Sequence, residues 1–213
     1  MKKVLNIILS VILCLSVVSP CFAIQSFAET GDETTLKFKD GKFRILVFAD
    51  PQDDVNPCEE TLDLMYASIE AAKPDLVVFT GDNIHGPSPV LYRSKKRVEK
   101  AIRQIMEPVT SQNIPFAIVY GNHDDEGGVS TETQLAIYQS SPGCLMSAGP
   151  DDITGCGNYN LLVWSSDGSR PMCNLWFLDS GTYGEKGVSK YARIEQDQID
   201  WYTSTAAALK EQY

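Results

Sequence analysis

Positive charge is scarce in this 213-residue sequence, in which 18 lysines and arginines stand against 28 aspartates and glutamates, for a formal net charge of −10. An acidic surface repels polyanions, so we expect neither nucleic acid nor an anionic membrane as a partner. The remaining composition, with 43% hydrophobic and 22% charged residues, is typical of a folded globular domain.

Long hydrophobic runs are also missing, apart from one stretch, Val4–Val18, near the N-terminus. A membrane-spanning helix needs about 20 apolar residues, and this run is shorter and is followed by Pro20. It comes directly after Lys2 and Lys3, which is the order of a secretory signal peptide. We predict a signal peptide over residues 1–23 and a flexible lead-in over 24–35, and hence a secreted or extracytoplasmic protein without stable membrane insertion after cleavage. A membrane helix is the alternative.

Cysteine is sparse in the predicted mature chain, which keeps Cys58, Cys144, Cys156 and Cys173. Their spacing matches no zinc module. Outside the cell they could form disulfides, and the sequence does not choose among the three possible pairings.

Three short apolar runs alternate with two helical patterns between residues 43 and 120. The runs are Phe43–Ala49, "DLVVFT" (75–80) and "PFAIVY" (115–120). A helix with Asn56 as its N-cap and a basic amphipathic helix ending near Val109 separate them. This alternation predicts a layered α/β fold with right-handed crossovers, and the unbroken apolar runs predict parallel strands that are buried on both faces.

The pattern changes after residue 130. A short helix is expected over Thr131–Tyr138, followed by an antiparallel hairpin of "NYNLLVW" (158–164) and "CNLWFLD" (173–179). A closing helix repeats apolar residues, from Ile199 to Leu209, on one face.

Polar side chains follow each of the three parallel strands. They are Asp50 and Gln52, then Asp82, then Asn122 and His123. Ligands of open α/β sheets bind beyond the carboxyl ends of the strands. Carboxylate, amide oxygen and imidazole donors at one edge suit a pair of divalent cations. A glycine before Asp82 and another before Asn122 would let the backbone turn sharply there.

These motifs resemble a known superfamily. Asp50-x-Gln52, Gly81-Asp82-Asn83 and Gly121-Asn122-His123-Asp124 are similar to the first three motifs of the calcineurin-like metallophosphoesterases. "KPDLVVFTGDN", "GNYNLLV" and "LWFLDSG" more narrowly resemble small, single-domain relatives of the purple acid phosphatases. The resemblance runs from about Phe43 to the end. It implies a four-layer α/β/β/α sandwich over residues 36–213, of which this chain would be the N-terminal portion with the C-terminal part missing.

The resemblance also implies a function and a role for each motif residue. The function is hydrolysis of phosphate mono- or diesters by attack of a dimetal-bound hydroxide, with a small phosphorylated substrate. Asp82 would bridge two divalent ions (Mn, Zn or Fe, with the identity open), Asp50 and Gln52 would serve the first, and Asn122 the second. His123 would contact the phosphate or protonate the leaving oxygen.

The sequence departs from the family pattern at three places. Gln52 stands where many members have histidine, and it either binds a metal weakly or only hydrogen-bonds a bound water. His85 is a metal ligand, a partner that orients His123, or a mere neighbour. No histidine follows His123, although the family uses later histidines as ligands. We therefore expect this 213-residue piece to be inactive as it stands, and a secreted, non-catalytic binding module on the same fold is the alternative function. The oligomeric state stays open.

Overall fold

The computed structural model describes residues 35–213. The predicted signal peptide and nearly all of the predicted lead-in lie outside these residues. The elements in chain order are β1 (Ile45–Phe48), α2 (Glu59–Ala72), β2 (Leu76–Phe79), α3 (Lys95–Thr110), β3 (Phe116–Ile118), α4 (Thr131–Gln139), β4 (Tyr159–Trp164), β5 (Pro171–Phe177) and α5 (Gln196–Gln212).

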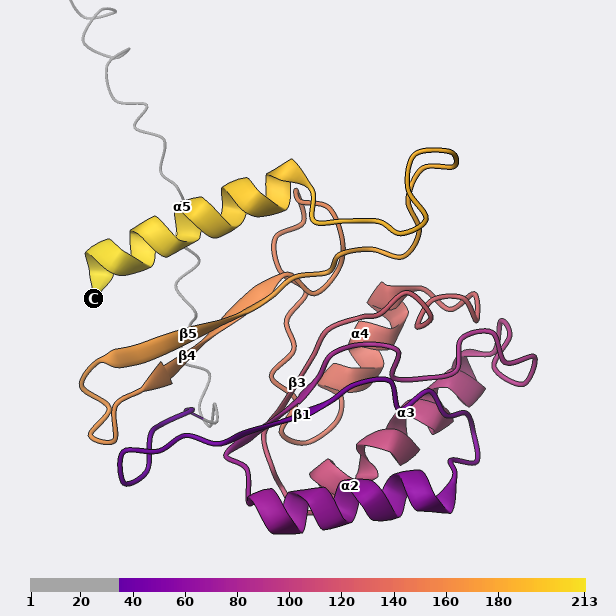
Figure 1. The fold of residues 1–213 in the computed structure, drawn as a ribbon, viewed down its shortest axis with the longest axis horizontal. Coiled ribbons are helices and arrows are strands. Elements are labelled where there is room, and N and C mark those ends of the chain that lie inside the picture. The colour runs from indigo at the N-terminus through magenta and orange to yellow at the C-terminus, as the bar shows by residue number, and fades with distance from the viewer. Residues whose placement is uncertain (1–34) are drawn as a thin grey trace, which may run out of the picture. The chain divides into compact units, whose positions relative to one another are not determined.

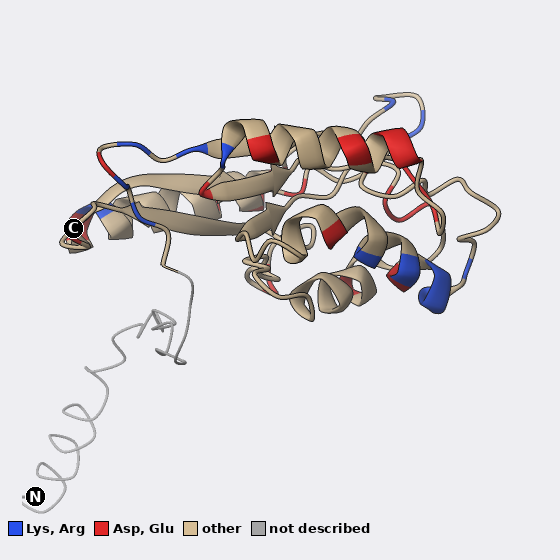
Figure 2. Ribbon diagram, turned by 90° about the horizontal axis from the view of Figure 1, so that it is seen from below, with Lys and Arg blue, Asp and Glu red and all other residues tan. Residues whose placement is uncertain are grey.

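The first three strands form one parallel sheet in the order β1-β2-β3. Ile45 pairs with Leu76, and Val77 pairs with Phe116, so the strands are in register and end at the same edge. Helices α2 and α3 are the crossover connections, and Figures 1 and 2 show them beside α4 on one face of the sheet. The predicted alternation of strands and helices is confirmed.

Strands β4 and β5 form a separate antiparallel hairpin. Figure 1 shows the order of the layers: helices α2 and α3, the parallel sheet, the hairpin, and α5 on the far side of the hairpin. The two sheets are joined through Tyr159, whose hydroxyl accepts a hydrogen bond from the Ile118 backbone at 3.0 Å. This arrangement agrees with the α/β/β/α sandwich that the sequence predicts.

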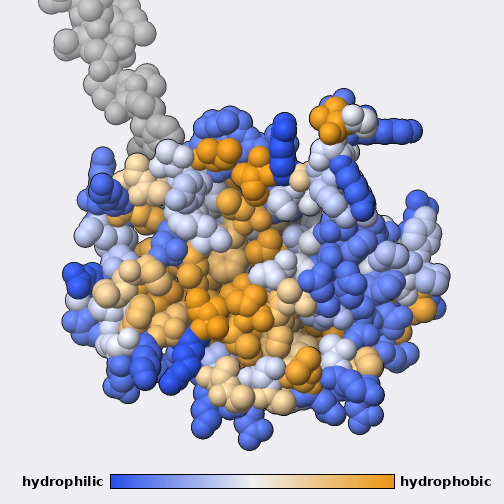
Figure 3. Space-filling view, viewed as in Figure 1, coloured by the Kyte–Doolittle hydropathy of each residue, from blue (hydrophilic) through white to orange (hydrophobic). Residues whose placement is uncertain are grey.

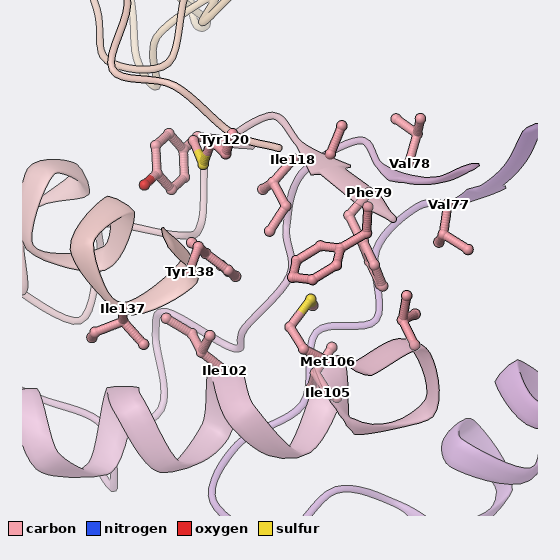
Figure 4. Close-up of a cluster of buried hydrophobic side chains, with 14 of the residues drawn as sticks. Val77, Val78, Phe79, Ile102, Ile105, Met106, Ile118, Tyr120, Ile137 and Tyr138 are labelled. Carbon is pink, nitrogen blue, oxygen red and sulfur yellow. The ribbon is translucent and has the colours of Figure 1, made fainter. Parts of the chain in front are cut away.

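The main core lies between the parallel sheet and its helices. Figure 4 shows Phe79 and Ile118 of the sheet facing Ile102 and Met106 of α3 and Tyr138 of α4, and all five side chains are fully buried. Burying such a side chain contributes about 1.5–3 kcal/mol. This packing fixes the strands whose ends carry the predicted site residues.

The prediction that the first strand is buried on both faces is wrong. Leu46 and Phe48 pack against the core, but Ile45 is 41% exposed and Val47 is 54% exposed. Side chains alternate between the faces of a strand, and the described residues cover only one face of β1. Figure 3 shows an apolar area on this side of the molecule, between β1 and the hairpin.

One helix prediction needs a smaller correction. Helix α2 begins at Glu59 with Cys58 as its N-cap, so Asn56 is not the cap. The predicted closing helix is confirmed as α5. Its apolar face is only partly covered, because Ile199 and Tyr202 are each 43% exposed. Trp176 of β5 contacts the ring of Tyr202 edge-on at 4.7 Å between ring centroids.

The four cysteines of residues 35–213 are free thiols. No helix in this described part of the chain has the length and apolar character needed to cross a membrane.

Candidate active site

The loops that follow β1 and β2 stay paired beyond the ends of the strands. The backbone N–H of Asp50 donates to the carbonyl oxygen of Gly81 at 3.2 Å, and that of Gln52 donates to the carbonyl oxygen of Asp82 at 3.0 Å. The structure therefore brings Asp50, Gln52 and Asp82 together at one edge of the sheet.

These three residues share an unusual backbone conformation. The φ angles are 53° at Asp50, 45° at Gln52 and 49° at Asp82. Non-glycine residues rarely adopt the left-handed region, and each such residue costs about 1 kcal/mol or more unless its surroundings impose it. Residues of this kind concentrate at active sites and ligand clamps.

The Asp82 carboxylate connects the three strand ends. Oδ1 accepts a hydrogen bond from the backbone N–H of His123 at 2.8 Å, and Oδ2 accepts one from Nε2 of Gln52 at 3.2 Å. Asp82 is buried, whereas Asp50 is exposed and Asn122 is partly buried. Asp50 and Asn122 are thus accessible to a ligand at this edge of the sheet, next to the buried Asp82.

Two glycines allow the loops after β2 and β3 to touch. Gly81 has φ of 105°, and a Cβ added there would lie 2.4 Å from the backbone nitrogen of Gly121. A Cβ on Gly121 would lie 2.2 Å from Oδ1 of Asp82. A sharp turn explains Gly81 as predicted, but at Gly121 the requirement is space for the Asp82 carboxylate.

Asp124 locks these loops together from inside the molecule. Its buried carboxylate accepts hydrogen bonds from the backbone N–H groups of Gly121 at 2.7 Å and Asn83 at 2.8 Å. Burial raises the pKa of Asp124 to about 6, although the backbone donors oppose this shift. Its role is to join the two loops, whereas the sequence marks it only as the last residue of the Gly121-Asn122-His123-Asp124 motif.

The His123 ring has a carboxylate partner that the sequence analysis missed. Nδ1 lies 2.6 Å from Oε2 of Glu126, and this hydrogen bond raises the pKa of His123, with partial burial acting in the opposite direction. Partial burial alone would raise the pKa of Glu126, but hydrogen bonds from Tyr183 and His123 lower it. The i, i+3 spacing of His123 and Glu126 was the available signal.

His85 lies next to this pair but does not bind it. A Cβ on the following residue, Gly86, would lie 1.6 Å from the carbonyl oxygen of His123, so the two backbones are in direct contact. His85 itself is exposed. Within residues 35–213 its side chain makes no hydrogen bond or ion pair, while Nδ1 of His123 is already bound by Glu126. The role of His85 stays a prediction.

The donor set fits hard divalent cations in its chemistry. Asp50, Gln52, Asp82 and Asn122 offer carboxylate and amide oxygens, which suit Mg²⁺ or Mn²⁺. No group of three or more histidine, cysteine, aspartate or glutamate side chains within residues 35–213 is arranged to hold a metal. Metal binding by these four residues therefore stays a prediction.

Comparison with known proteins decides the family. The sequence model of the calcineurin-like phosphoesterases matches residues 43–205. The chain belongs to the calcineurin-like phosphoesterase family. This phosphoesterase family is typically dependent on two metal ions, and the match covers every predicted site residue.

The curated relatives place the chain near the purple acid phosphatases, as predicted. "Probable inactive purple acid phosphatase 14" of Arabidopsis thaliana is 30% identical over 100% of this chain and 58% of its own length. "Probable inactive purple acid phosphatase 29" of the same plant is 30% identical over 91% of the chain and 55% of its own length. "Phosphatase DCR2" of Saccharomyces cerevisiae is 31% identical over 75% of the chain and 30% of its own length. The chain therefore spans a little more than half the length of the two plant relatives and less than a third of the yeast relative. No solved structure matches it significantly.

Proposed function

We propose that the protein hydrolyses esters of phosphoric acid at the shared edge of β1, β2 and β3. The observation that carries this proposal is the left-handed backbone of Asp50, Gln52 and Asp82 at neighbouring strand ends. Folding alone gives no reason to place three strained, polar, non-glycine residues side by side, whereas a ligand site does. The family supports the reaction class.

Asp50, Gln52, Asp82 and Asn122 would hold the metals. Two divalent ions supply positive charge that neutralises a phosphoryl transition state and lowers the pKa of a bound water. Asp82 would be the central ligand, because its carboxylate already lies between Gln52 and the backbone of His123. Its burial and both hydrogen bonds hold the carboxylate in one orientation.

His123 would handle the proton of the leaving group. As water forms the new P–O bond and loses a proton to solvent, the ester P–O bond breaks and its electron pair stays on the leaving oxygen. That oxygen would take the proton from Nε2 of His123, which then regains one from solvent. A placed acid of this kind typically contributes 10²- to 10⁴-fold in rate, and the hydrogen bond to Glu126 raises the pKa of His123, which favours the protonated ring.

Substrate class and location are part of the same proposal. The net charge of −10 disfavours nucleic acid and supports a small phosphorylated substrate. Lys2, Lys3 and the apolar run Val4–Val18 support secretion of the protein.

A non-catalytic binding module on the same fold is the second candidate. It is favoured by the names of two relatives, each called a probable inactive purple acid phosphatase. The lack of a cluster of metal-binding acids, histidines or cysteines in residues 35–213 points the same way. Under this alternative the strained edge would bind a ligand without turning it over.

Hydrolysis of p-nitrophenyl phosphate by the full-length protein, with Mn²⁺ or Zn²⁺ added, separates the two candidates. We expect turnover that Asp82→Asn abolishes and that His123→Ala lowers a few-fold on this activated ester and by about 10²-fold or more on phenyl phosphate. Asp63→Asn, at an exposed acid on α2, is the matched control and should retain full activity. Turnover that survives Asp82→Asn would remove this site assignment, and no turnover at all would favour the binding module.

A further inference from the structure

Glu126 joins two side chains that come from distant parts of the chain. One carboxylate oxygen, Oε2, lies 2.6 Å from Nδ1 of His123. The other, Oε1, accepts a hydrogen bond from the hydroxyl of Tyr183, a residue between β5 and α5. Each oxygen of the carboxylate thus has its own partner.

The contact with Glu126 determines which ring nitrogen of His123 carries the proton. A carboxylate only accepts hydrogen bonds, so Nδ1 must be protonated to bind it. Nε2 makes no hydrogen bond within residues 35–213 and stays available to a substrate.

The backbone around this pair allows little movement. The N–H of Glu126 donates to the carbonyl oxygen of His123 at 3.3 Å, which closes the turn. Gly86 packs directly on this turn, since a Cβ there would lie 1.6 Å from the carbonyl oxygen of His123 and 3.1 Å from Cβ of Glu126. The distance that the Glu126 side chain must bridge is therefore set by the fold.

Tyr183 holds the other side of the carboxylate. Its ring stacks on Tyr191 with 6.3 Å between the centroids and an interplanar angle of 21°. The same two residues form a backbone bridge, and the Ser189 hydroxyl donates to the carbonyl oxygen of Tyr191 at 2.6 Å. The segment after β5 thus presents the Tyr183 hydroxyl to Glu126 from a folded loop.

We propose that Glu126 is a positioning residue that fixes the His123 ring with Nδ1 protonated and Nε2 directed to the leaving oxygen, and that Tyr183 holds Glu126 in place for this task. The proposal rests on the proposed phosphoester hydrolysis for its catalytic consequence. Its structural part, the choice of tautomer, stands independently of activity.

The tautomer can be measured by NMR of the protein labelled with ¹⁵N-histidine. The chain has only two histidines, so a His85→Asn variant assigns both rings. At a pH where His123 is neutral, we expect its proton on Nδ1. In Glu126→Ala the preference should move to Nε2, because the acceptor of Nδ1 is gone. A wild-type His123 protonated on Nε2, or a tautomer unchanged in Glu126→Ala, would overturn the proposal.

Two further variants guard against indirect effects. Glu185→Ala removes an exposed carboxylate two residues from Tyr183 and should leave both histidine spectra unchanged. If Glu126→Ala does not fold, Glu126→Gln keeps the volume and an oxygen that can accept from Nδ1. That variant should keep the proton on Nδ1 of His123, and a proton on Nε2 would contradict the proposal.

Leaving-group dependence then tests the catalytic consequence. Phenyl phosphate has a poor leaving group and needs the proton from His123, whereas p-nitrophenyl phosphate needs it less. We expect Glu126→Ala to lower kcat on phenyl phosphate by about 10²-fold and on p-nitrophenyl phosphate only a few-fold, with Tyr183→Phe showing the same pattern more weakly. Tyr202→Phe, on α5, is the control for loss of a hydroxyl.

Equal losses on both esters would show general damage and contradict a positioning role. If the wild-type protein hydrolyses neither ester, the proposed function fails, and the NMR result alone decides whether Glu126 sets the tautomer.

Discussion

The parallel sheet and the hairpin differ in how completely they are covered. Every side chain of β2 and β3 is at most 8% exposed. In the hairpin most positions are only half-buried, and Met172 of β5 is 48% exposed. Between β5 and α5 a hollow of about 250 Å³ remains, lined by residues such as Cys173 and Leu209.

The proposed site uses the two regions differently. The parallel sheet supplies Asp50, Asp82 and His123 from strand ends that are fixed by a dense core, so strained backbone can persist there. The hairpin side supplies Tyr183 from a loop, and the hydroxyl of that residue donates a hydrogen bond to Glu126. The densely packed half of the fold thus carries the groups that need fixed geometry. The less covered half contributes a contact to Glu126, the partner of His123.

Substitution of Gly121, where the loops after the parallel strands touch, should have the largest effect on stability. Gly121→Ala would place a methyl group 2.2 Å from Oδ1 of Asp82, and we expect a loss of about 3 kcal/mol or more in the free energy of unfolding. Gly127→Ala, six residues on, meets nothing closer than 3.5 Å and should cost far less. Urea denaturation of both variants measures this, and equal costs would show that the loops are not in the close contact described.

Truncation of aliphatic side chains compares the cores directly. Ile118 of β3 is fully buried, whereas Leu175 of β5 is only partly buried. We expect Ile118→Ala to lower the free energy of unfolding by about 3 kcal/mol, as for other buried aliphatic residues. Leu175→Ala should lower it by about 1 kcal/mol, because Leu175 is already partly exposed. A cost at Leu175 equal to or above that at Ile118 would reverse the comparison. Unfolding curves monitored by circular dichroism provide both values.

The His123–Glu126 pair should have the smallest effect on the free energy of unfolding, and this effect should depend on pH. The pKa of His123 is raised above 6.5, so its contribution is present below that pH and is lost as the pH rises through the folded-state pKa. The pKa of Glu126 is lowered below 4.5, so its contribution is present above that pH and is lost as the pH falls through the folded-state value. Both groups therefore stabilise the fold most between these two values.

Glu126→Gln should remove the extra stability between these two pH values. The wild type should exceed the variant by up to about 1 kcal/mol near pH 5.5, as for a partly exposed ion pair, and by less near pH 9. Urea denaturation at both pH values measures the difference. A gap that does not change with pH would mean that the pair carries no charge interaction.

Much of the parallel half could be predicted because its signals are local. Unbroken apolar runs mark β1, β2 and β3, and their separation by amphipathic segments implies parallel pairing. Once the strands are parallel, the residues after them must share an edge, which brings Asp50, Asp82 and His123 together. The exposed face of β1 was missed because an apolar run does not reveal what covers it.

The partners of the site residues could not be read from the sequence in the same way. Asp124 faces inward and Glu126 faces His123, but both stand in one run of three acids, and the sequence does not show which way each side chain points. Tyr183 lies 57 positions from Glu126 in the chain, and such a contact depends on how the two sheets stack. The contacts of Trp176 with Trp201 and Tyr202 of helix α5 depend on this stacking for the same reason.

The central claim is that the ends of the three parallel strands bind divalent cations together. Mn²⁺ is paramagnetic and broadens nearby NMR signals even when it binds weakly, so its titration into ¹⁵N-histidine-labelled protein tests the claim most directly. We predict broadening of the His123 signals that Asp82→Asn abolishes and Asp63→Asn leaves intact. Signals of His123 that stay sharp, or that broaden equally in Asp82→Asn, would contradict the account.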